Sequence, residues 1–345
     1  MRIRIISEIQ EFFAYKYQWD AIFNNQDYSF FQSFEFNYYS WITELSKNKL
    51  NRLCVISIIN NELVSAIFPL YIDSKKRLRF INDRHADFCD ALSNKKYDFE
   101  NILSEISNQL KFDSVHFINL TKDSFLYHLY KENKSNNNLI KPFAKYSCLV
   151  IPEGIFPNNV LRYRSKQKTE FRRVKKKNTD KDHHILSKGD ADFPISEIYQ
   201  LKERMIELGL RKINFLDEDR LLLLKELYNS NRMLVSIVKN KSNTHAISFI
   251  LRNENEYLFW IDMYDNAKMI NIYNYILFIE NISSENSVKI NFGRGVYDYK
   301  IGNFKPEIKQ LFAIYIYENQ LQLSLFLFID KIKGILKLIY KKFIK

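Results

Sequence analysis

Residues 233–262, MLVSIVKNKSNTHAISFILRNENEYLFWID, contain three apolar runs separated by polar turns. Each run has the length and the β-branched or aromatic content that strands prefer. The runs are Met233 to Lys239, His245 to Arg252 and Glu256 to Asp262. A helical spacing of apolar residues follows in Ile270 to Ser284, and then a short strand in Val288 to Phe292. This stretch predicts an antiparallel meander covered by a helix.

The first half of the chain has a similar order of elements. Leu53 to Ile59 and Leu63 to Ile72 are apolar runs joined by the turn residues Asn60-Asn61-Glu62, which predicts a hairpin. A helix is expected in Asn101 to Leu110 and a strand in Ser114 to Leu120. The repeated order predicts a duplicated α+β architecture, in which each copy is a mostly antiparallel central sheet flanked by helices.

The length agrees with two such domains. The 345 residues exceed the roughly 250–300 at which single cores stop growing. A hydrophobic content of 46% excludes disorder as the main state. We expect an N-terminal domain in residues 1–152, a second domain in 153–320 and a separate tail helix in 321–345.

Glycine is scarce, with only 7 residues in the whole chain, against roughly 7% in an average protein. None of the seven lies in a GxGxxG dinucleotide fingerprint or a Walker A loop, so those nucleotide-binding classes are excluded. Three of them, Gly293, Gly295 and Gly302, lie within ten residues of one another. This clustering favours a functional turn there.

The three cysteines, Cys54, Cys89 and Cys148, are far apart, and none pairs with a histidine at zinc spacing. They indicate buried thiols in a reducing compartment, and no metal is expected. The N-terminus, MRIRIISEIQEFFAYKYQWD, lacks the apolar segment of a secretory signal, and no uncharged run reaches about 18 residues. The expected location is therefore cytoplasmic.

The formal net charge of +12 comes from two segments. Arg162 to Asp182 holds ten basic and three acidic residues, and the tail from Asp330 holds six basic residues and one acidic residue. The first segment predicts a basic helix with an anionic partner, such as a donor phosphate, an anionic glycan or lipid headgroups. Nucleic acid would satisfy the same electrostatics, but no DNA-reading motif is present, so sequence-specific DNA binding is not expected.

The tail itself has the pattern of an amphipathic helix. Between Ile332 and Phe343, apolar residues recur at helical spacing, and Lys333, Lys337 and Lys341 are four residues apart. Such a helix could lie peripherally on the inner face of a membrane. The alternative is a helix packed on the protein or in an oligomer interface.

Three stretches together resemble a known family. They are FFQSFEF (30–36) leading to Trp41, LRYRSKQKTEFRRVKKK (161–177), and INFGRG (290–295) followed by Tyr299-Lys300 and Phe304. In this order they resemble the GNAT-superfamily acyltransferases of the cellulose-biosynthesis CelD/BcsL type. These are distant relatives of the Fem peptidoglycan aminoacyl-ligases.

The resemblance implies two GNAT-like halves, of which the second is active. It also implies transfer of an acyl group, usually from acyl-CoA as co-substrate, to an amine or hydroxyl. The acceptor in such proteins is often a sugar in an envelope-polysaccharide precursor.

Candidate residues for the donor and for catalysis cluster after the strand 288–292. Two glycines around Arg294 permit a tight turn, and its guanidinium could hold a phosphate bidentately. Arg164, Lys168 and Arg172 of the basic helix are further donor-binding candidates. The resemblance implies that Lys300 stabilises charge at the transferring acyl group. Its neighbours Asp298 and Tyr299 could relay protons, and Tyr297, two residues from Tyr299, could share its strand face.

Candidates for binding the acceptor come from both halves. Asp87 and Asp90 lie in a loop where family members often have an acidic residue, although a polar turn that caps a helix explains them equally well. Trp260 and Asp262 lie where the resemblance places the substrate cleft, with core packing as the alternative for Trp260.

One place departs from the family. The segment Lys268 to Asn274, where GNAT proteins have a glycine-rich pyrophosphate loop, contains no glycine. Two other functions therefore stay open. One is a Fem-like transferase that uses aminoacyl-tRNA, and the other is a non-catalytic GNAT-like scaffold at the membrane.

Overall fold

The computed structural model describes residues 2–25, 28–93, 97, 99–132, 138–151, 165–253, 256–267, 269–282 and 288–343. The chain packs into two compact units. Unit 1 consists of Met1–Asn37, Leu45–Ala144 and Gln310–Lys345, and unit 2 consists of Tyr38–Glu44 and Lys145–Lys309. Residues 310–345 thus pack with the N-terminal part of the chain, whereas the sequence analysis expected a second domain up to 320 and a separate tail.

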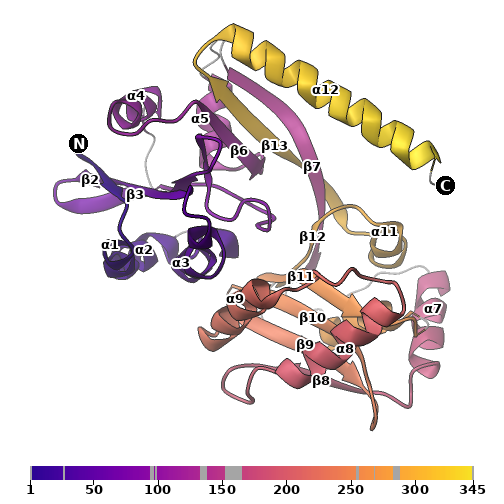
Figure 1. The fold of residues 1–345 in the computed structure, drawn as a ribbon. Coiled ribbons are helices and arrows are strands. Elements are labelled where there is room, and N and C mark those ends of the chain that lie inside the picture. The colour runs from indigo at the N-terminus through magenta and orange to yellow at the C-terminus, as the bar shows by residue number, and fades with distance from the viewer. Residues whose placement is uncertain are drawn as a thin grey trace. The chain divides into compact units, whose positions relative to one another are not determined.

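Unit 1 is built on a mostly antiparallel sheet (Figure 1). Its strands lie in the order β1 (Arg2–Ile6), β2 (Arg52–Asn60), β3 (Leu63–Ile72), β4 (Arg77–Phe80), β6 (Ser114–Leu120) and β13 (Glu307–Tyr317), with β5 (Leu92–Ser93) beside β3. Strands β4 and β6 run parallel, and the other pairs are antiparallel. The predicted hairpin is β2–β3, and its turn residues Asn61 and Glu62 both have positive φ, as tight hairpin turns require.

The helices of unit 1 include α1 (Ile9–Ala14), α2 (Lys16–Phe23), α4 (Phe99–Gln109), α5 (Phe125–Glu132) and α12 (Gln320–Phe343), and α3 (Phe34–Thr43) begins in it. The FFQSFEF stretch explains part of its core. The rings of Phe31 and Phe36 are 4.9 Å apart, and Phe34 lies 5.6 Å from Phe12 and 5.9 Å from Trp19. The aromatic residues of this motif therefore pack the interior of unit 1.

Unit 2 contains the strands that the opening stretch predicts. Their order is β7 (Asn138–Ile151), β12 (Val288–Arg294), β11 (Glu256–Tyr264), β10 (Thr244–Arg252), β9 (Met233–Lys239) and β8 (Asp182–Leu186). Strands β11 and β12 are parallel, and the other pairs are antiparallel. Two long strands, β7 and β13, each have residues in both units.

Helices cover both faces of this sheet. The helices α7 (Ser165–Lys176) and α10 (Ile270–Asn281) share a core with Ile250 of β10, while Phe193 packs between Phe249 and Tyr228 of α9 (Glu218–Asn229). Because successive residues of a strand point to opposite faces, α9 lies opposite α10. The helix α8 (Ile195–Glu207) lies near α9 in Figure 1, and α11 (Asp298–Phe304) follows β12.

The fold class expected from the sequence is confirmed. The structure is α+β, with mostly antiparallel sheets flanked by helices. The strands predicted in 233–262 are present as β9, β10 and β11. One local expectation is wrong: Tyr297 and Tyr299 do not share a strand face, because residues 298–304 form α11.

A buried ion pair supports the turn between β3 and β4. The Asp73 carboxylate accepts hydrogen bonds from the Arg77 Nε at 2.8 Å and from the backbone N–H groups of Lys75 and Arg77 at 2.9 and 3.1 Å. Burial by itself would raise the pKa of Asp73, but the hydrogen bonds from Arg77 outweigh it and lower the pKa below its ordinary value. A carboxyl group with a lowered pKa stabilises the fold above its unfolded-state pKa, and this stabilisation is lost as the pH falls through the folded-state pKa.

We therefore predict that Asp73→Asn lowers the free energy of unfolding at neutral pH by about 1–3 kcal/mol. The variant should also lose less additional stability than the wild type when the pH falls below about 4. Chemical denaturation at a series of pH values measures both effects. Asp123→Asn, which removes an exposed carboxylate from the same unit, is the control. Equal acid sensitivity of Asp73→Asn and the wild type would contradict the assignment.

Candidate active site

The candidate site lies where the pairing of β11 and β12 ends. In the described residues, these parallel strands pair only over Glu256–Leu258 and Lys289–Asn291. The next residue of β12 is Phe292, and its carbonyl accepts a hydrogen bond of 2.7 Å from the Nζ of Lys300. The lysine therefore binds the backbone of β12 at the end of its pairing with β11.

Lys300 is the central residue of this site. It is only 4% exposed, although a lysine is seldom buried without a compensating partner. Its Nζ lies 3.9 Å from Asp262 Oδ2 and 5.5 to 5.9 Å from the ring centres of Tyr275, Tyr297 and Tyr299. A carboxylate, a carbonyl and three aromatic faces all favour the charged ammonium.

The carboxylate of Asp262 is held by hydroxyl groups from two other elements. Ser248 of β10 donates to Oδ1 at 2.7 Å, and Tyr275 of α10 donates to Oδ2. Burial raises the pKa of Tyr275 well above its ordinary value, and the negative charge of Asp262 raises it further. The same two causes raise the pKa of Tyr299, whose ring centre lies 5.9 Å from the Lys300 Nζ. Both tyrosines therefore keep their protons at neutral pH.

A chain of buried polar side chains continues from Ser248 under α10. Ser248 Oγ accepts a hydrogen bond of 3.0 Å from the amide nitrogen of Asn274, and the Asn274 oxygen accepts one of 2.7 Å from Ser236 Oγ. His183 Nε2 is 2.8 Å from Ser236 Oγ. Because the Ser236 proton points to Asn274, His183 must be the donor in this last contact, which fixes its Nε2–H tautomer.

His183, at the outer end of this series of hydrogen bonds, is neutral. Burial lowers the pKa of His183 to about 4, so the ring carries no charge near neutral pH. Asn281 can donate to the remaining ring nitrogen at 3.3 Å. Every donor in the chain thus points toward Asp262, which is its final acceptor.

The structure brings together three residues that the sequence analysis had assigned to different roles. Lys300 and Tyr299 were expected to be catalytic and Asp262 to bind the acceptor, yet all three belong to one cluster. Asp298 is exposed in the first turn of α11, where a carboxylate suits the helix macrodipole. Its role as a proton relay stays a prediction.

The turn Gly293-Arg294-Gly295 has the backbone that its glycines suggested. Gly293 and Gly295 have φ values of 73° and 104°, and the Gly295 N–H donates to the Lys145 carbonyl at 2.8 Å. A Cβ at Gly295 would lie 2.8 Å from the Tyr297 ring, which is too close for a real side chain. The turn therefore leaves room for Tyr297 beside Lys300, and Arg294 is half-buried next to it.

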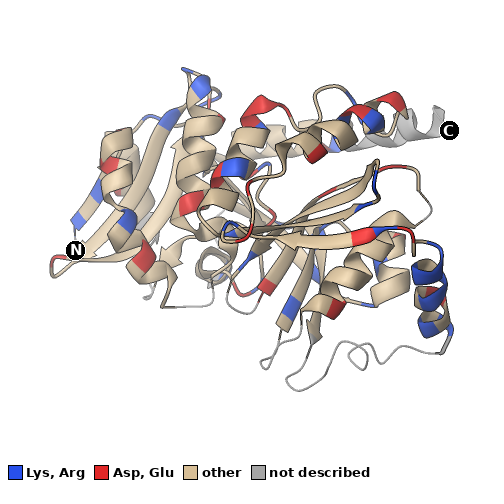
Figure 2. Ribbon diagram, turned by 90° about the horizontal axis from the view of Figure 1, so that it is seen from below, with Lys and Arg blue, Asp and Glu red and all other residues tan. Residues whose placement is uncertain are grey.

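The basic helix packs beside α11. Phe171 of α7 and Phe304 of α11 have ring centres 5.7 Å apart, and Lys175 pairs with Glu280 of α10 at 2.6 Å. Lys168 and Arg172 are exposed, and Figure 2 shows the Lys and Arg residues gathered along α7. Arg164 lies outside the described residues. The proposed donor-binding role of these residues stays a prediction.

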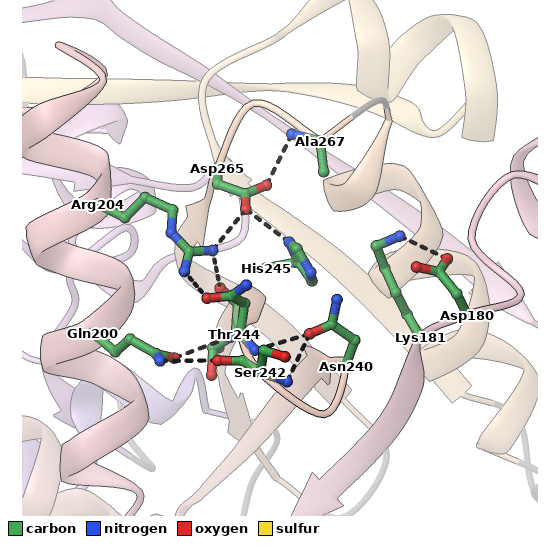
Figure 3. A network of polar contacts seen from close by, with 11 residues as sticks. Asp180, Lys181, Gln200, Arg204, Asn240, Ser242, Thr244, His245, Asp265 and Ala267 are labelled. Carbon is green, nitrogen blue, oxygen red and sulfur yellow. Dashed lines mark hydrogen bonds and ion pairs between the residues drawn. The ribbon is translucent and has the colours of Figure 1, made fainter.

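A second polar network fixes the segment that enters α10 (Figure 3). Asp265 is buried and accepts hydrogen bonds from the Ala267 N–H at 2.8 Å and from Arg204 Nη1 at 3.3 Å, and it lies 2.8 Å from His245 Nδ1. Met269 then takes a left-handed conformation, with φ of 57°, directly before the helix. This segment stands where GNAT proteins have a glycine-rich loop. Here the backbone that leads into α10 is positioned by the hydrogen bonds of Asp265.

The candidate acceptor residues occupy different environments. Phe249 pairs with Ile261 and Ile250 with Phe259, so Trp260 is the extra residue of a β-bulge. Trp260 lies under the guanidinium of Arg220 from α9, at 5.7 Å, whereas Asp262 contacts α10. Arg220 is itself buried and paired with Glu44 at 3.1 Å.

The two acidic candidates of the first half belong to unit 1. Asp90 accepts backbone hydrogen bonds from Phe125 at 2.6 Å and from Leu126 at 3.2 Å, at the start of α5. This is the helix-capping alternative that the sequence left open. Asp87 is buried nearby in the sequence. A role for either residue in binding the acceptor stays a prediction.

Sequence reasoning missed Ser236, Ser248, Asn274, Tyr275 and Arg220. A usable signal was present for the serines, since each interrupts an otherwise apolar strand, and a buried polar residue is more informative than an exposed one. In the described part of the chain, no group of three or more His, Cys, Asp or Glu residues could hold a metal ion.

No family model and no curated protein matches the chain. Solved structures do share its fold. FemX matches with a TM-score of 0.61 and 11% identity, covering 94% of this chain and 99% of that one. The C-terminal domain of a putative lysylphosphatidylglycerol synthetase from Agrobacterium fabrum matches with a TM-score of 0.59 and 9% identity, covering 93% and 95%. L-PGS from Bacillus licheniformis matches with a TM-score of 0.53 and 14% identity, covering 76% and 84%.

At these identities the likeness is one of fold. The chain shares its fold with FemX and with the lysylphosphatidylglycerol synthetase domain. The narrower resemblance to the CelD/BcsL type finds no match and stays a prediction.

The contact between Tyr275 and Asp262 can be tested by Tyr275→Phe. We expect the free energy of unfolding to fall by about 1–3 kcal/mol, because a partly buried carboxylate loses a hydroxyl donor. Tyr273→Phe, the same change on the same helix at a residue outside the cluster, should have a smaller effect. Chemical denaturation of the two variants decides the point, and equal losses would argue against a stabilising role for this hydrogen bond.

Proposed function

We propose that the protein is an acyltransferase that acts on an amine or hydroxyl of a sugar or envelope-polysaccharide precursor. Acyl-CoA is the first candidate donor, as the resemblance to the CelD/BcsL type suggests. The observation that supports this function most directly is the buried Lys300 ammonium beside Asp262 and the tyrosine hydroxyls. Such a cluster combines a fixed positive charge with groups that can exchange a proton.

In the proposed reaction, the acceptor nitrogen or oxygen attacks the carbonyl carbon of the donor thioester. A new C–N or C–O bond forms, and the carbonyl electron pair moves onto its oxygen. The Lys300 ammonium stabilises that oxyanion, which it can do efficiently because it is already oriented and shielded from water. The intermediate then collapses, and the C–S bond breaks with its electron pair on sulfur.

The proton balance involves Asp262 and its hydroxyl partners. The proton released by the attacking group passes to the Asp262–Tyr275–Tyr299 cluster, and one proton from this cluster returns to the leaving thiolate. The cluster therefore ends each cycle in its starting state. Arg294 and the exposed basic residues of α7 are proposed to hold the donor phosphates.

A second candidate is a Fem-like transferase that takes an aminoacyl group from tRNA. Two observations favour it. The fold similarity to FemX extends over 94% of the chain, and the segment before α10 lacks the glycines that a CoA pyrophosphate loop normally has. The exposed basic face of α7 suits an RNA phosphate backbone as well as it suits CoA.

Lys300→Met tests the reaction chemistry. The substitution keeps the side-chain volume but removes the charge, so we expect kcat to fall by about 10²–10³-fold, as when another enzyme loses one oxyanion donor. Lys309→Met, which removes a half-exposed lysine from the same unit, should keep near-normal activity. Full activity of Lys300→Met on an identified substrate would rule out the proposed role.

Ligand-induced thermal shifts test the donor. A panel of CoA thioesters should raise Tm if acyl-CoA is the donor, since a ligand at 100 times its Kd stabilises the native state by about 2.7 kcal/mol. The double variant Lys168→Glu/Arg172→Glu should reduce this shift, while Lys111→Glu/Lys122→Glu in unit 1 should not. A shift with tRNA and none with thioesters would select the Fem-like alternative, and no shift with either would favour the non-catalytic scaffold.

A further inference from the structure

The helix α12 has one face that packs against the rest of unit 1. Leu323 is buried, and the ring of Phe326 lies 4.7 Å from Tyr315 of β13 and 5.4 Å from His116 of β6. Asp330, one turn further on, pairs with Lys141 of β7 at 2.5 Å. These residues follow at intervals of three and four, so they define a single side of the helix.

A second apolar stripe runs along the opposite side. Its members are 40% to 80% exposed, and they follow one another at intervals of four, three, four and four: Leu321, Leu325, Phe328, Ile332 and Leu336. A helix that is apolar toward its protein should be polar on its outer side. A continuous exposed stripe of large side chains instead indicates a surface that another apolar phase covers.

Basic residues accompany this stripe on both sides. Lys331 and Lys333 are exposed and lie next to Ile332 in the sequence, so they project about 100° to either side of it. In the sequence the pattern continues to the C-terminus, with Lys337, Lys341, Lys342 and Lys345 and with no acidic residue after Asp330. Apolar positions continue at helical spacing as well, at Ile335, Ile339 and Phe343.

We propose that α12 docks the protein onto an anionic lipid surface. The exposed stripe inserts at the level of the acyl chains, and the flanking lysines bind the phosphate headgroups. A helix that lies in the plane of the interface has one apolar side, positive charges along the borders of that side, and too many charges to cross the bilayer. The helix α12 has all three properties. In the described part of the chain, no helix has the length and apolar character needed to cross a membrane.

This inference does not depend on the proposed chemistry. The stripe belongs to unit 1, whereas the Lys300 cluster belongs to unit 2. Lipid binding and catalytic activity can therefore be measured and can fail separately. A second copy of the chain is the other partner that could cover the stripe, and the experiment is designed to detect it.

The test is co-sedimentation of the full chain with vesicles. We expect binding to vesicles of phosphatidylcholine mixed with phosphatidylglycerol, much weaker binding to phosphatidylcholine alone, and weakening in high salt. The variant Leu325→Ser/Phe328→Ser/Ile332→Ser should bind the mixed vesicles at least about tenfold more weakly. Lys331→Glu/Lys333→Glu should reduce binding to the anionic vesicles selectively.

The control variant is Tyr17→Ser/Leu63→Ser. It removes two exposed apolar side chains from the same unit but leaves the stripe intact, so its binding should match that of the wild type. Circular dichroism checks that α12 remains helical in each variant. The proposal is overturned if the wild type does not bind anionic vesicles or if the stripe variant binds them equally well. It is also overturned if light scattering shows that the stripe holds two copies together and vesicles do not compete.

Discussion

The second unit depends on keeping one ammonium group away from water. A lysine charge in a protein interior is unfavourable unless the surroundings replace the hydration that it loses. Lys300 receives that replacement from the Phe292 carbonyl, the Asp262 carboxylate and the faces of three tyrosines. The contacting groups come from β11, β12, α10 and α11, together with the turn between β12 and α11. The position of the charge therefore depends on how these two strands and two helices pack.

The requirements of this charge extend beyond its neighbours. The Asp262 carboxylate itself needs hydrogen-bond donors, and the hydroxyl groups of Ser248 and Tyr275 supply them. Ser248 then needs Asn274, and Asn274 needs Ser236, until the chain reaches His183 near the surface. Polar residues that look isolated within apolar strands are thus successive members of one network, and a fully satisfied network of this kind also specifies how α10 sits on the sheet.

The sequence was informative where local pattern decides structure. The three strands from 233 to 262, the hairpin in the first half and the amphipathic end of the chain all follow from periodicity and turn residues. It was less informative where distant residues meet. Nothing in the spacing of Asp262 and Lys300 shows that they approach to 3.9 Å, because that contact depends on how β11, β12 and α11 pack. The helix α11 was missed because seven residues with two aromatic side chains and a glycine give no clear helical pattern.

The bulge at Trp260 has a wider consequence for β11. In a regular strand, residues three positions apart, such as Phe259 and Asp262, would face opposite sides. The extra residue resets that alternation, so an aromatic ring and a carboxylate both reach α10, while the tryptophan reaches Arg220 on the other helix layer. The position of the bulge thus determines which side chains of β11 face α10 and which face α9. If Trp260 were kept but the strand paired regularly, Asp262 would face the opposite side of the sheet and leave the cluster, although no residue of the network would have changed.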